Sequence, residues 1–203
     1  MALSRSLRIG LFIVAGFIIG AGSALALFSQ AWQQVFVSAS GGKALIGGPF
    51  VLTDQNGKQV TDKDFRGRFM LVYFGFTFCP DVCPSALQVM AAALDKLGPK
   101  AAKITPIFIT IDPERDTPDK MAQYVQSFDP RLVGLTGTPD EIAAVTKEYR
   151  VYAKKVDDPK STAGYTMDHS SIIYVMGPDG SYRTHFTHTT NVDAMAAHLA
   201  KML

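Results

Sequence analysis

Phe69–Phe76, with the sequence FMLVYFGF, is a nearly continuous apolar run. Strands that are buried on both faces of a sheet have such runs, whereas half-exposed strands alternate apolar and polar residues. The run therefore predicts a central strand. A helix is expected after it over Pro84–Leu97, where apolar residues recur at the spacing of one helix face.

Strands and helices alternate along the rest of the domain. Further strands are expected at Ile104–Ile111, Leu132–Leu135 and Val151–Lys155, and helices at Pro118–Phe128, Pro139–Tyr149 and Asn191–Met202 with Thr117, Thr138 and Asn191 as N-caps. Hairpins are expected to join Phe50–Thr53 to Lys58–Val60 and Ser171–Met176 to Ser181–Phe186. This order predicts an α/β sandwich with a mixed, partly parallel central sheet.

An apolar segment precedes this domain. Ile9–Phe28 has 20 residues without a charge, about the length that crosses a bilayer as a helix. Arg5 and Arg8 come before it, so the positive-inside rule places residues 1–8 in the cytoplasm. Ala24–Ala26 fits a signal-peptide cleavage site, but signal peptides have shorter apolar stretches. We therefore expect one uncleaved transmembrane helix at residues 9–28.

The remaining organisation follows from this anchor. Residues 29–48 are expected to form a tether that ends in the Gly-rich sequence GGKALIGG, and residues 49–203 the folded domain. A mitochondrial presequence would be amphipathic and richer in Arg and Ser. The expected location is a bacterial inner membrane, with the domain in the periplasm.

Composition excludes several functional classes. Apart from Arg5 and Arg8, the chain has 18 basic and 18 acidic residues, so no nucleic-acid partner is expected. Two cysteines are too few for a disulfide-stapled scaffold or a four-cysteine zinc site.

Both cysteines lie in one motif, Cys79-Pro80-Asp81-Val82-Cys83, between the central strand and the helix. A helix N-terminus lowers the pKa of a thiol, and the thiolate is both the nucleophile and the metal ligand. The motif has three intervening residues, whereas the thioredoxin-type redox motif has two. This spacing suits chelation of one ion by both sulfurs. A structural disulfide is the weaker alternative because so short a loop gains little from closure. Asp81 is expected to be a solvated turn or helix-capping residue.

Two thiolates need a third ligand, and the chain has four histidines. His169 lies in an irregular polar segment before a buried strand, where a rigid scaffold presents ligands, and Asp168 could orient its ring. We expect His198 on a helix face and His185 and His188 at the end of a hairpin. Two thiolates and one imidazole suit copper or zinc, and spacing alone does not choose between them.

Three motifs together resemble the SCO/SenC family of copper chaperones: GFTFCPDVCP at residues 75–84, TIDPERDTP at 110–118 and DHSSIIYVMGPDG at 168–180. The resemblance covers roughly residues 49–203, and the anchor before them matches too. It implies a thioredoxin-like fold and copper, as Cu(I) or Cu(II), bound by Cys79, Cys83 and His169. No ligand role follows for Asp112–Pro118, which is expected to be a charged loop beside the site or facing a partner, or a solvated loop that ends in a helix cap.

The resemblance also implies a role in the assembly of cytochrome c oxidase. Family members deliver copper to the binuclear site of oxidase subunit II, or keep the cysteines of that site reduced. The expected partners are therefore subunit II, a periplasmic copper donor and thiol reductant, and the membrane.

Two other functions use the same residues. A thiol–disulfide oxidoreductase would attack a disulfide with one of Cys79 and Cys83 and resolve the mixed disulfide with the other. A copper or redox sensor for the respiratory chain is the other alternative, and a peroxidase explains the metal-type histidine less well. His169 separates the first two hypotheses, because copper delivery needs it as a ligand and thiol chemistry alone does not.

Overall fold

The computed structural model describes residues 45–203 except 160 and 163. The expected cytoplasmic segment 1–8, the anchor at 9–28 and residues 29–44 of the tether lie outside the described residues. Within the described part of the chain, no helix combines the length and the apolar character needed to span a membrane.

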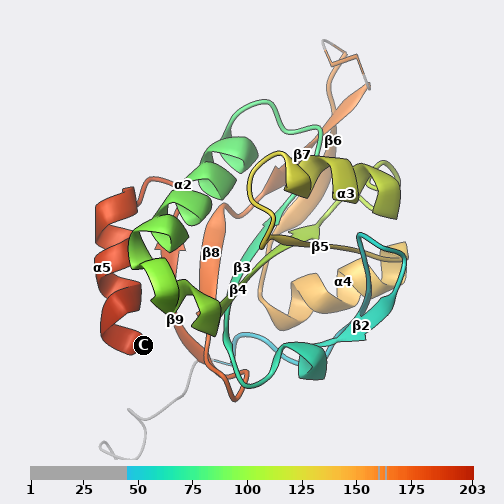
Figure 1. The fold of residues 1–203 in the computed structure, drawn as a ribbon. Helices are drawn as coiled ribbons and strands as arrows, with labels where there is room; N and C mark the ends of the chain where they lie inside the picture. Colours follow the sequence, from blue (N-terminus) through green and yellow to red (C-terminus); the bar gives the residue numbers. More distant parts are fainter. Residues whose placement is uncertain (1–44, 160, 163) are drawn as a thin grey trace, which may run out of the picture. The chain divides into compact units, whose positions relative to one another are not determined.

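A seven-stranded mixed sheet lies at the centre of the domain, in the order β2-β1-β5-β4-β3-β8-β9 (Figure 1). Its strands are β1 (Val51–Asp54), β2 (Gln59–Thr61), β3 (Phe69–Gly75), β4 (Ile104–Thr110), β5 (Val133–Thr136), β8 (Ile172–Met176) and β9 (Tyr182–Thr187). The neighbours β3, β4 and β5 run parallel, and every other pair in the sheet is antiparallel. The predicted α/β class and mixed sheet are confirmed.

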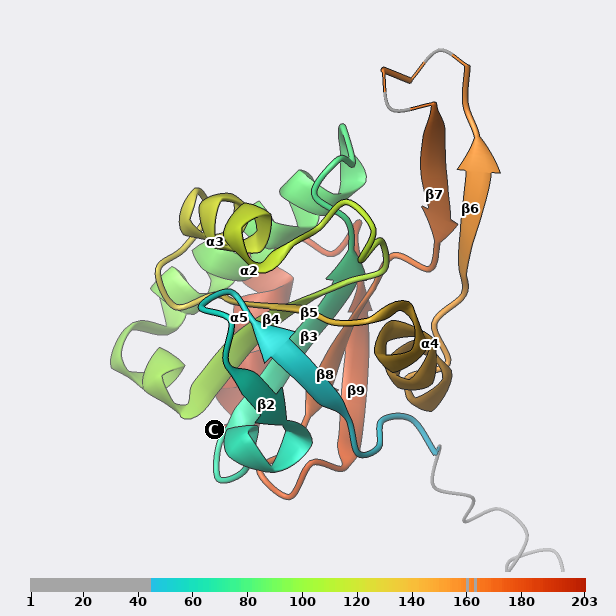
Figure 2. The same cartoon turned by 90° about the vertical axis from the view of Figure 1, so that its right-hand side faces the viewer.

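Within residues 45–203, as far as they are described, four α-helices cover the sheet: α2 (Val82–Leu97), α3 (Pro118–Gln126), α4 (Pro139–Glu148) and α5 (Val192–Met202). Short 3-10 helices, η1 (Asp62–Phe65) and η2 (Gly98–Lys103), lie in the connections. Figure 2 shows α2, α3 and α5 on one side of the sheet and α4 on the other. The crossovers β3–α2–β4 and β4–α3–β5 advance in the same direction, so right-handed connections place both helices on one face. Thr117, Thr138 and Asn191 cap α3, α4 and α5 as predicted.

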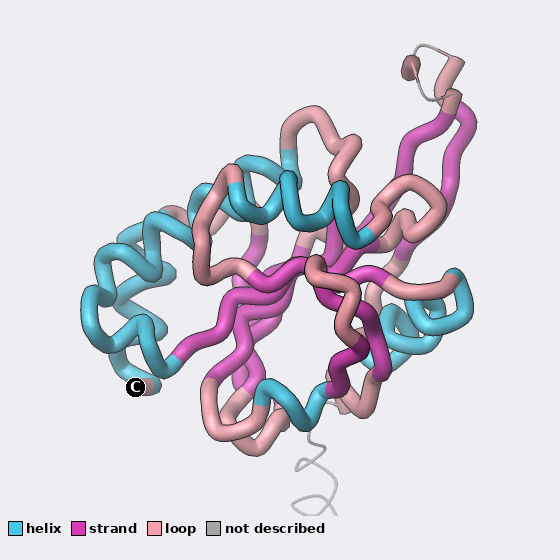
Figure 3. Tube along the Cα trace, turned by 45° about the vertical axis from the view of Figure 1, so that its right-hand side comes forward, coloured by secondary structure: helices cyan, strands magenta, loops and turns pink. Residues whose placement is uncertain are grey.

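Successive aromatic residues of β3 serve the two sides of the core. Phe74 packs against Tyr149 and Tyr174, with ring centroids 5.2 and 6.1 Å apart. Tyr73 packs on the opposite face against Phe108, at 6.3 Å. All seven residues of β4 are buried, and so are six of the seven in β3. The apolar runs therefore form the two-sided core strands that they predict (Figure 3).

A separate two-stranded sheet contains β6 (Ala153–Asp157) and β7 (Tyr165–His169). This β6–β7 hairpin projects from the domain in Figure 2. The prediction of an irregular segment around His169 was wrong, because residues 165–169 form a strand that pairs in antiparallel register with β6. The mostly polar sequence of β7 gives no apolar signal for a strand.

Replacing Leu71 by Ala should test the central position of β3. Leu71 has no exposed surface, so Leu71→Ala leaves a cavity between the two helical layers and should lower the free energy of unfolding by about 2–5 kcal/mol. Urea denaturation measures the change. Leu45→Ala is the control, since Leu45 is 80% exposed and its loss should change stability by less than about 0.5 kcal/mol. Equal effects of the two substitutions would contradict this account of the core.

Candidate metal centre

Strand register brings three segments to the carboxyl end of β3. Parallel pairing sets Gly75 opposite Thr110, so the chain leaves β3 and β4 side by side. Antiparallel pairing sets Tyr73 opposite Ile173, so the residues just before β8 reach the same edge. The loop with the cysteines, the loop after β4 and the end of β7 therefore meet, although they are far apart in sequence.

The two cysteines differ in burial. Helix α2 begins at Val82, two residues earlier than predicted, which puts Cys83 in its first turn with no exposed surface. Cys79 lies in the preceding loop and is half-buried, and both thiols are free. Cys79 is therefore partly accessible to solvent, and Cys83 is not.

The sulfur of Cys79 caps helix α2. It accepts a hydrogen bond of 3.4 Å from the backbone N–H of Cys83. Asp81 occupies the N-cap position and is exposed, but its side chain makes no capping hydrogen bond to any described residue. A sulfur atom thus satisfies one of the free N–H groups of the helix, at the end where the helix dipole favours negative charge.

His169 reaches the buried sulfur from β7. Its Nε2 lies 3.6 Å from Cys83 Sγ, and its Nδ1 lies 3.1 Å from the carbonyl oxygen of Ser170. A carbonyl only accepts, so Nδ1 carries a hydrogen and Nε2 faces the sulfurs. Ser170, and not the neighbouring Asp168, therefore orients the ring. The ring also packs edge-on against Tyr73, at 6.3 Å.

Hydrogen bonding separates the acidities of the two thiols. The Cys83 thiol donates to Cys79, which lowers the pKa of Cys79 to about 4 against the opposing effect of burial. The same hydrogen bond, together with burial, raises the pKa of Cys83. At neutral pH the pair therefore holds one thiolate, on Cys79, and one thiol, on Cys83, whose sulfur also accepts from the Tyr73 hydroxyl at 3.8 Å.

Gly75 makes room for the buried sulfur. A Cβ atom at this position would lie 2.8 Å from Cys83 Sγ and 2.9 Å from Cε2 of Phe108. Both distances are too short for carbon, so a side chain at residue 75 would displace either the sulfur or the ring. The glycine in the motif thus has a packing role that sequence reasoning missed.

A buried carboxyl group ties the cysteine loop to β4. Asp116 has no exposed surface and accepts hydrogen bonds from the Thr77 backbone N–H at 3.0 Å, the Thr77 hydroxyl at 2.5 Å and the Thr110 hydroxyl at 2.6 Å. Burial raises its pKa, and these hydrogen bonds oppose the rise. The alternative that residues 112–118 form a solvated loop was wrong, because Asp112 is buried as well as Asp116. The loop lies beside the site.

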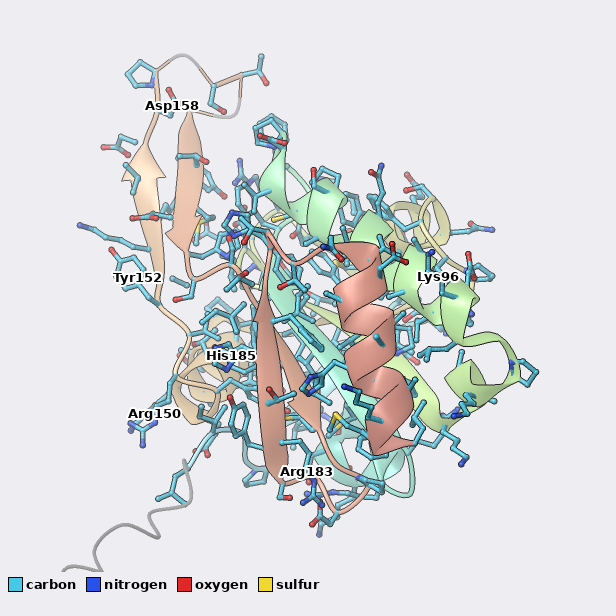
Figure 4. All side chains as sticks on the ribbon, turned by 90° about the vertical axis from the view of Figure 1, so that its left-hand side faces the viewer. Lys96, Arg150, Tyr152, Asp158, Arg183 and His185 are labelled. Atoms are coloured by element: carbon cyan, nitrogen blue, oxygen red, sulfur yellow. The ribbon has the colours of Figure 1, made fainter. Side chains whose placement is uncertain are left out.

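The other histidines lie where the sequence predicted. His198, on α5, packs edge-on against Phe186 at 5.5 Å. His185, labelled in Figure 4, lies on β9 and its Nδ1 is 2.5 Å from the Tyr182 hydroxyl. His188 is exposed in the turn after β9. His169 alone among them contacts a cysteine in the described residues.

The geometry of the three residues fits a soft metal ion. Bonds of about 2.3 Å to a thiolate and about 2.0 Å to an imidazole, at a trigonal angle, place sulfur and nitrogen about 3.7 Å apart. The observed distance between Cys83 Sγ and His169 Nε2 is 3.6 Å. As the described side chains stand, no three His, Cys, Asp or Glu residues already enclose an ion. The sulfur and nitrogen atoms that would bind the metal are the same atoms that now share hydrogen bonds. Metal binding would therefore replace these hydrogen bonds.

Alkylation with iodoacetamide should distinguish the two thiols. We expect Cys79 to react first, with a rate that rises through a pH midpoint of about 4, because the thiolate is the nucleophile. Cys83→Ala should move the midpoint upward, toward the ordinary cysteine value of about 8.5, because it removes the main hydrogen bond to Cys79. Mass spectrometry of the labelled peptide measures the site and the rate. Faster labelling of Cys83 would contradict the assignment.

The model of the SCO1/SenC family matches residues 38–203. The human "Protein SCO1 homolog, mitochondrial" is 46% identical over 162 residues, covering 78% of this chain and 53% of that protein. The chain spans about half the length of such curated relatives.

Solved structures show the same fold. "Structure of Bradyrhizobium japonicum ScoI with copper bound" is 51% identical, with a TM-score of 0.72, and the match covers 78% of this chain and 99% of that one. BsSco, described as having a disulfide switch and as a member of the Sco family of cytochrome c oxidase assembly proteins, supports the fold at 24% identity, with a TM-score of 0.60 and coverage of 78% and 95%. These likenesses confirm the predicted thioredoxin-like α/β fold, and the chain belongs to the SCO1/SenC family.

Proposed function

We propose that this chain is a membrane-anchored copper metallochaperone for the assembly of cytochrome c oxidase, and that Cys79, Cys83 and His169 hold the copper. The observation that carries the proposal is the approach of His169 Nε2 to within 3.6 Å of Cys83 Sγ, beside the Cys79 sulfur. Thiol–disulfide exchange requires only the two sulfurs, whereas a three-coordinate copper site also requires the oriented imidazole as its third ligand. The copper bound in the Bradyrhizobium structure supports copper as the metal.

The donor atoms suit copper as cargo. Two sulfurs and one imidazole nitrogen are soft ligands, which select Cu(I) over hard cations. Cys79 offers a thiolate at neutral pH, whereas Cys83 has to lose its proton before it can bind. Because Cys79 is half-buried and Cys83 is fully buried, a partner's ligand reaches the cargo from the side of Cys79. Transfer by exchange of one ligand at a time fits this open face.

The proposal also includes the location of the chain and its partners. Ile9–Phe28 would anchor the chain in a bacterial inner membrane, with the folded domain in the periplasm. The recipient would be the binuclear copper site of oxidase subunit II, and a periplasmic donor and a thiol reductant would load and maintain the chaperone. The description of BsSco as one of a family of oxidase assembly proteins supports this role.

Thiol–disulfide exchange is a second candidate, favoured by the unequal thiols. The Cys79 thiolate would attack a disulfide of the partner and release one partner thiol. Cys83, after losing its proton, would attack the Cys79 sulfur and release the second partner thiol. Two electrons pass to the partner, and the chain is left with a Cys79–Cys83 disulfide. This step would reduce the cysteines of the recipient site before copper reaches them.

A Cu(I) titration of the full chain, reduced and anaerobic, tests the proposal. We expect one copper per wild-type chain in competition with a chromophoric Cu(I) chelator. His169→Ala and Cys83→Ser should each weaken binding by at least about 100-fold, since loss of a residue that only supports a ligand already costs about 10- to 100-fold. His185→Ala is the matched control because this histidine is exposed on β9, and it should bind like wild type.

Two results would overturn the proposal of a metallochaperone. One is no stable copper binding by the wild type together with active disulfide exchange, which would leave an oxidoreductase. The other is wild-type affinity in His169→Ala, which would remove the imidazole from the site.

A further inference from the structure

We infer that Arg115 is a positioning residue for the metal centre: its guanidinium fastens the β6–β7 hairpin, which carries His169, to the loop that carries Cys79. The inference rests on the proposed copper site and assigns a role to the motif at residues 110–118, for which no ligand role was expected.

The hairpin needs such a fastening. Strands β6 and β7 pair only with each other in the described residues, so no sheet hydrogen bonds hold them to the seven-stranded sheet. His169 is the last residue of β7. Its distance from Cys83 therefore depends on side-chain contacts between the hairpin and the domain, in addition to the covalent connections at either end.

Arg115 makes two of these contacts, both to Tyr165 at the start of β7. Its guanidinium carbon lies 3.8 Å from the centre of the Tyr165 ring, and its Nη1 donates to the Tyr165 carbonyl oxygen at 3.2 Å. The Tyr165 hydroxyl in turn donates to Asp112 Oδ1 at 3.0 Å, while Arg115 Nε donates to Asp112 Oδ2. These contacts form a closed ring that joins the start of β7 to the loop after β4.

The same guanidinium lies over the cysteine loop. Its carbon is 5.0 Å from the ring centre of Phe78, the residue before Cys79, and 5.8 Å from that of Phe76. The Phe76 ring packs edge-on against His169, at 5.9 Å. Arg115 thus contacts both segments that supply the proposed ligands, and one of its aromatic partners contacts a ligand directly.

Strand geometry transmits the constraint to His169. Alternate residues of a strand share a face, so Tyr165, Met167 and His169 project to the same side of β7. Four residues of strand span about 13 Å. The contact with Arg115 holds Tyr165 in place. It therefore also determines the side of β7 from which His169 projects and the position of His169 along the strand axis.

The burial of this contact separates it from an ordinary surface ion pair. The Arg115 and Asp112 side chains are 15% and 4% exposed. Arg115 Nη2 is buried without a hydrogen-bond partner among the described residues, so the guanidinium keeps its stacked position at the cost of one hydrogen bond. The neighbouring pair of Lys155 and Glu114 is 47% and 61% exposed, and exposed pairs of this kind contribute little.

Copper affinity of the full chain tests the inference. Arg115→Ala and Arg115→Lys should each weaken Cu(I) binding by about 10- to 100-fold, the range for residues that support a ligand. Lysine keeps the charge but lacks the planar group that stacks on Tyr165 and bonds two partners. Arg183→Ala is the matched control and should bind like wild type. Arg183 (labelled in Figure 4) is an exposed arginine of β9 that pairs with Asp179.

A double-mutant cycle separates positioning from general damage. If Arg115 acts through His169, the variant Arg115→Ala/His169→Ala should bind copper no more weakly than His169→Ala alone. Additive losses would overturn the inference. Wild-type affinity in both Arg115 variants would also overturn it, and would leave the proposed copper site intact provided that His169→Ala still binds weakly.

Hydrogen exchange of the metal-free chain gives a readout that does not involve copper. Arg115→Ala should speed exchange of the β6 and β7 amides while those of β3 and β4 stay protected. Unchanged exchange in the hairpin would overturn the fastening role. Should Arg115→Ala fail to fold, Tyr165→Leu removes the ring from the other side of the contact and should give the same loss of affinity and the same faster exchange.

Discussion

The hydrogen bond from the backbone N–H of Cys83 to the sulfur of Cys79 joins the chemistry of the site to the start of helix α2. It satisfies a helix end that would otherwise be unpaired, and it holds the two sulfurs together without a covalent bond. The position of α2 depends in turn on β3, whose last residue, Gly75, leaves space for the buried sulfur. A change in β3, in the cysteine loop or in the start of α2 would therefore also change the positions of the two thiols.

Two elements of the domain meet this unit at the end of β3. The loop after β4 braces it through the buried carboxyl of Asp116, and the β6–β7 hairpin brings His169 against it. The two thiols consequently lie in different surroundings: Cys79 is half-buried and anionic, and Cys83 is buried and protonated. This asymmetry suits both candidate chemistries, since a cargo ion and a disulfide partner would each arrive at Cys79, while the imidazole distinguishes copper binding from thiol exchange.

Much of the fold was predictable because its signals are local. The apolar runs of β3 and β4, and the capping residues Thr117 and Thr138, act within a few residues of themselves. The pairing of Cys79 with Cys83 was predictable for the same reason. Strand β7 was not, because its polar residues are held by a partner strand and not by an apolar face. The buried hydrogen bonds of Asp116 were also missed. Its partners Thr77 and Thr110 lie 39 and 6 residues earlier in the chain, and no periodic pattern connects them to Asp116.

The β6–β7 hairpin has a consequence for solubility. Among the described residues β6 and β7 join no larger sheet, so this two-stranded sheet has two edges without a partner there. Free sheet edges favour pairing with strands of other molecules. The last four residues of β6 are exposed and include Lys154, Lys155 and Asp157. Charges on an edge strand oppose such pairing because a neighbouring copy would have to bury them. The β6–β7 hairpin, which positions His169, therefore also contains charged residues that oppose aggregation.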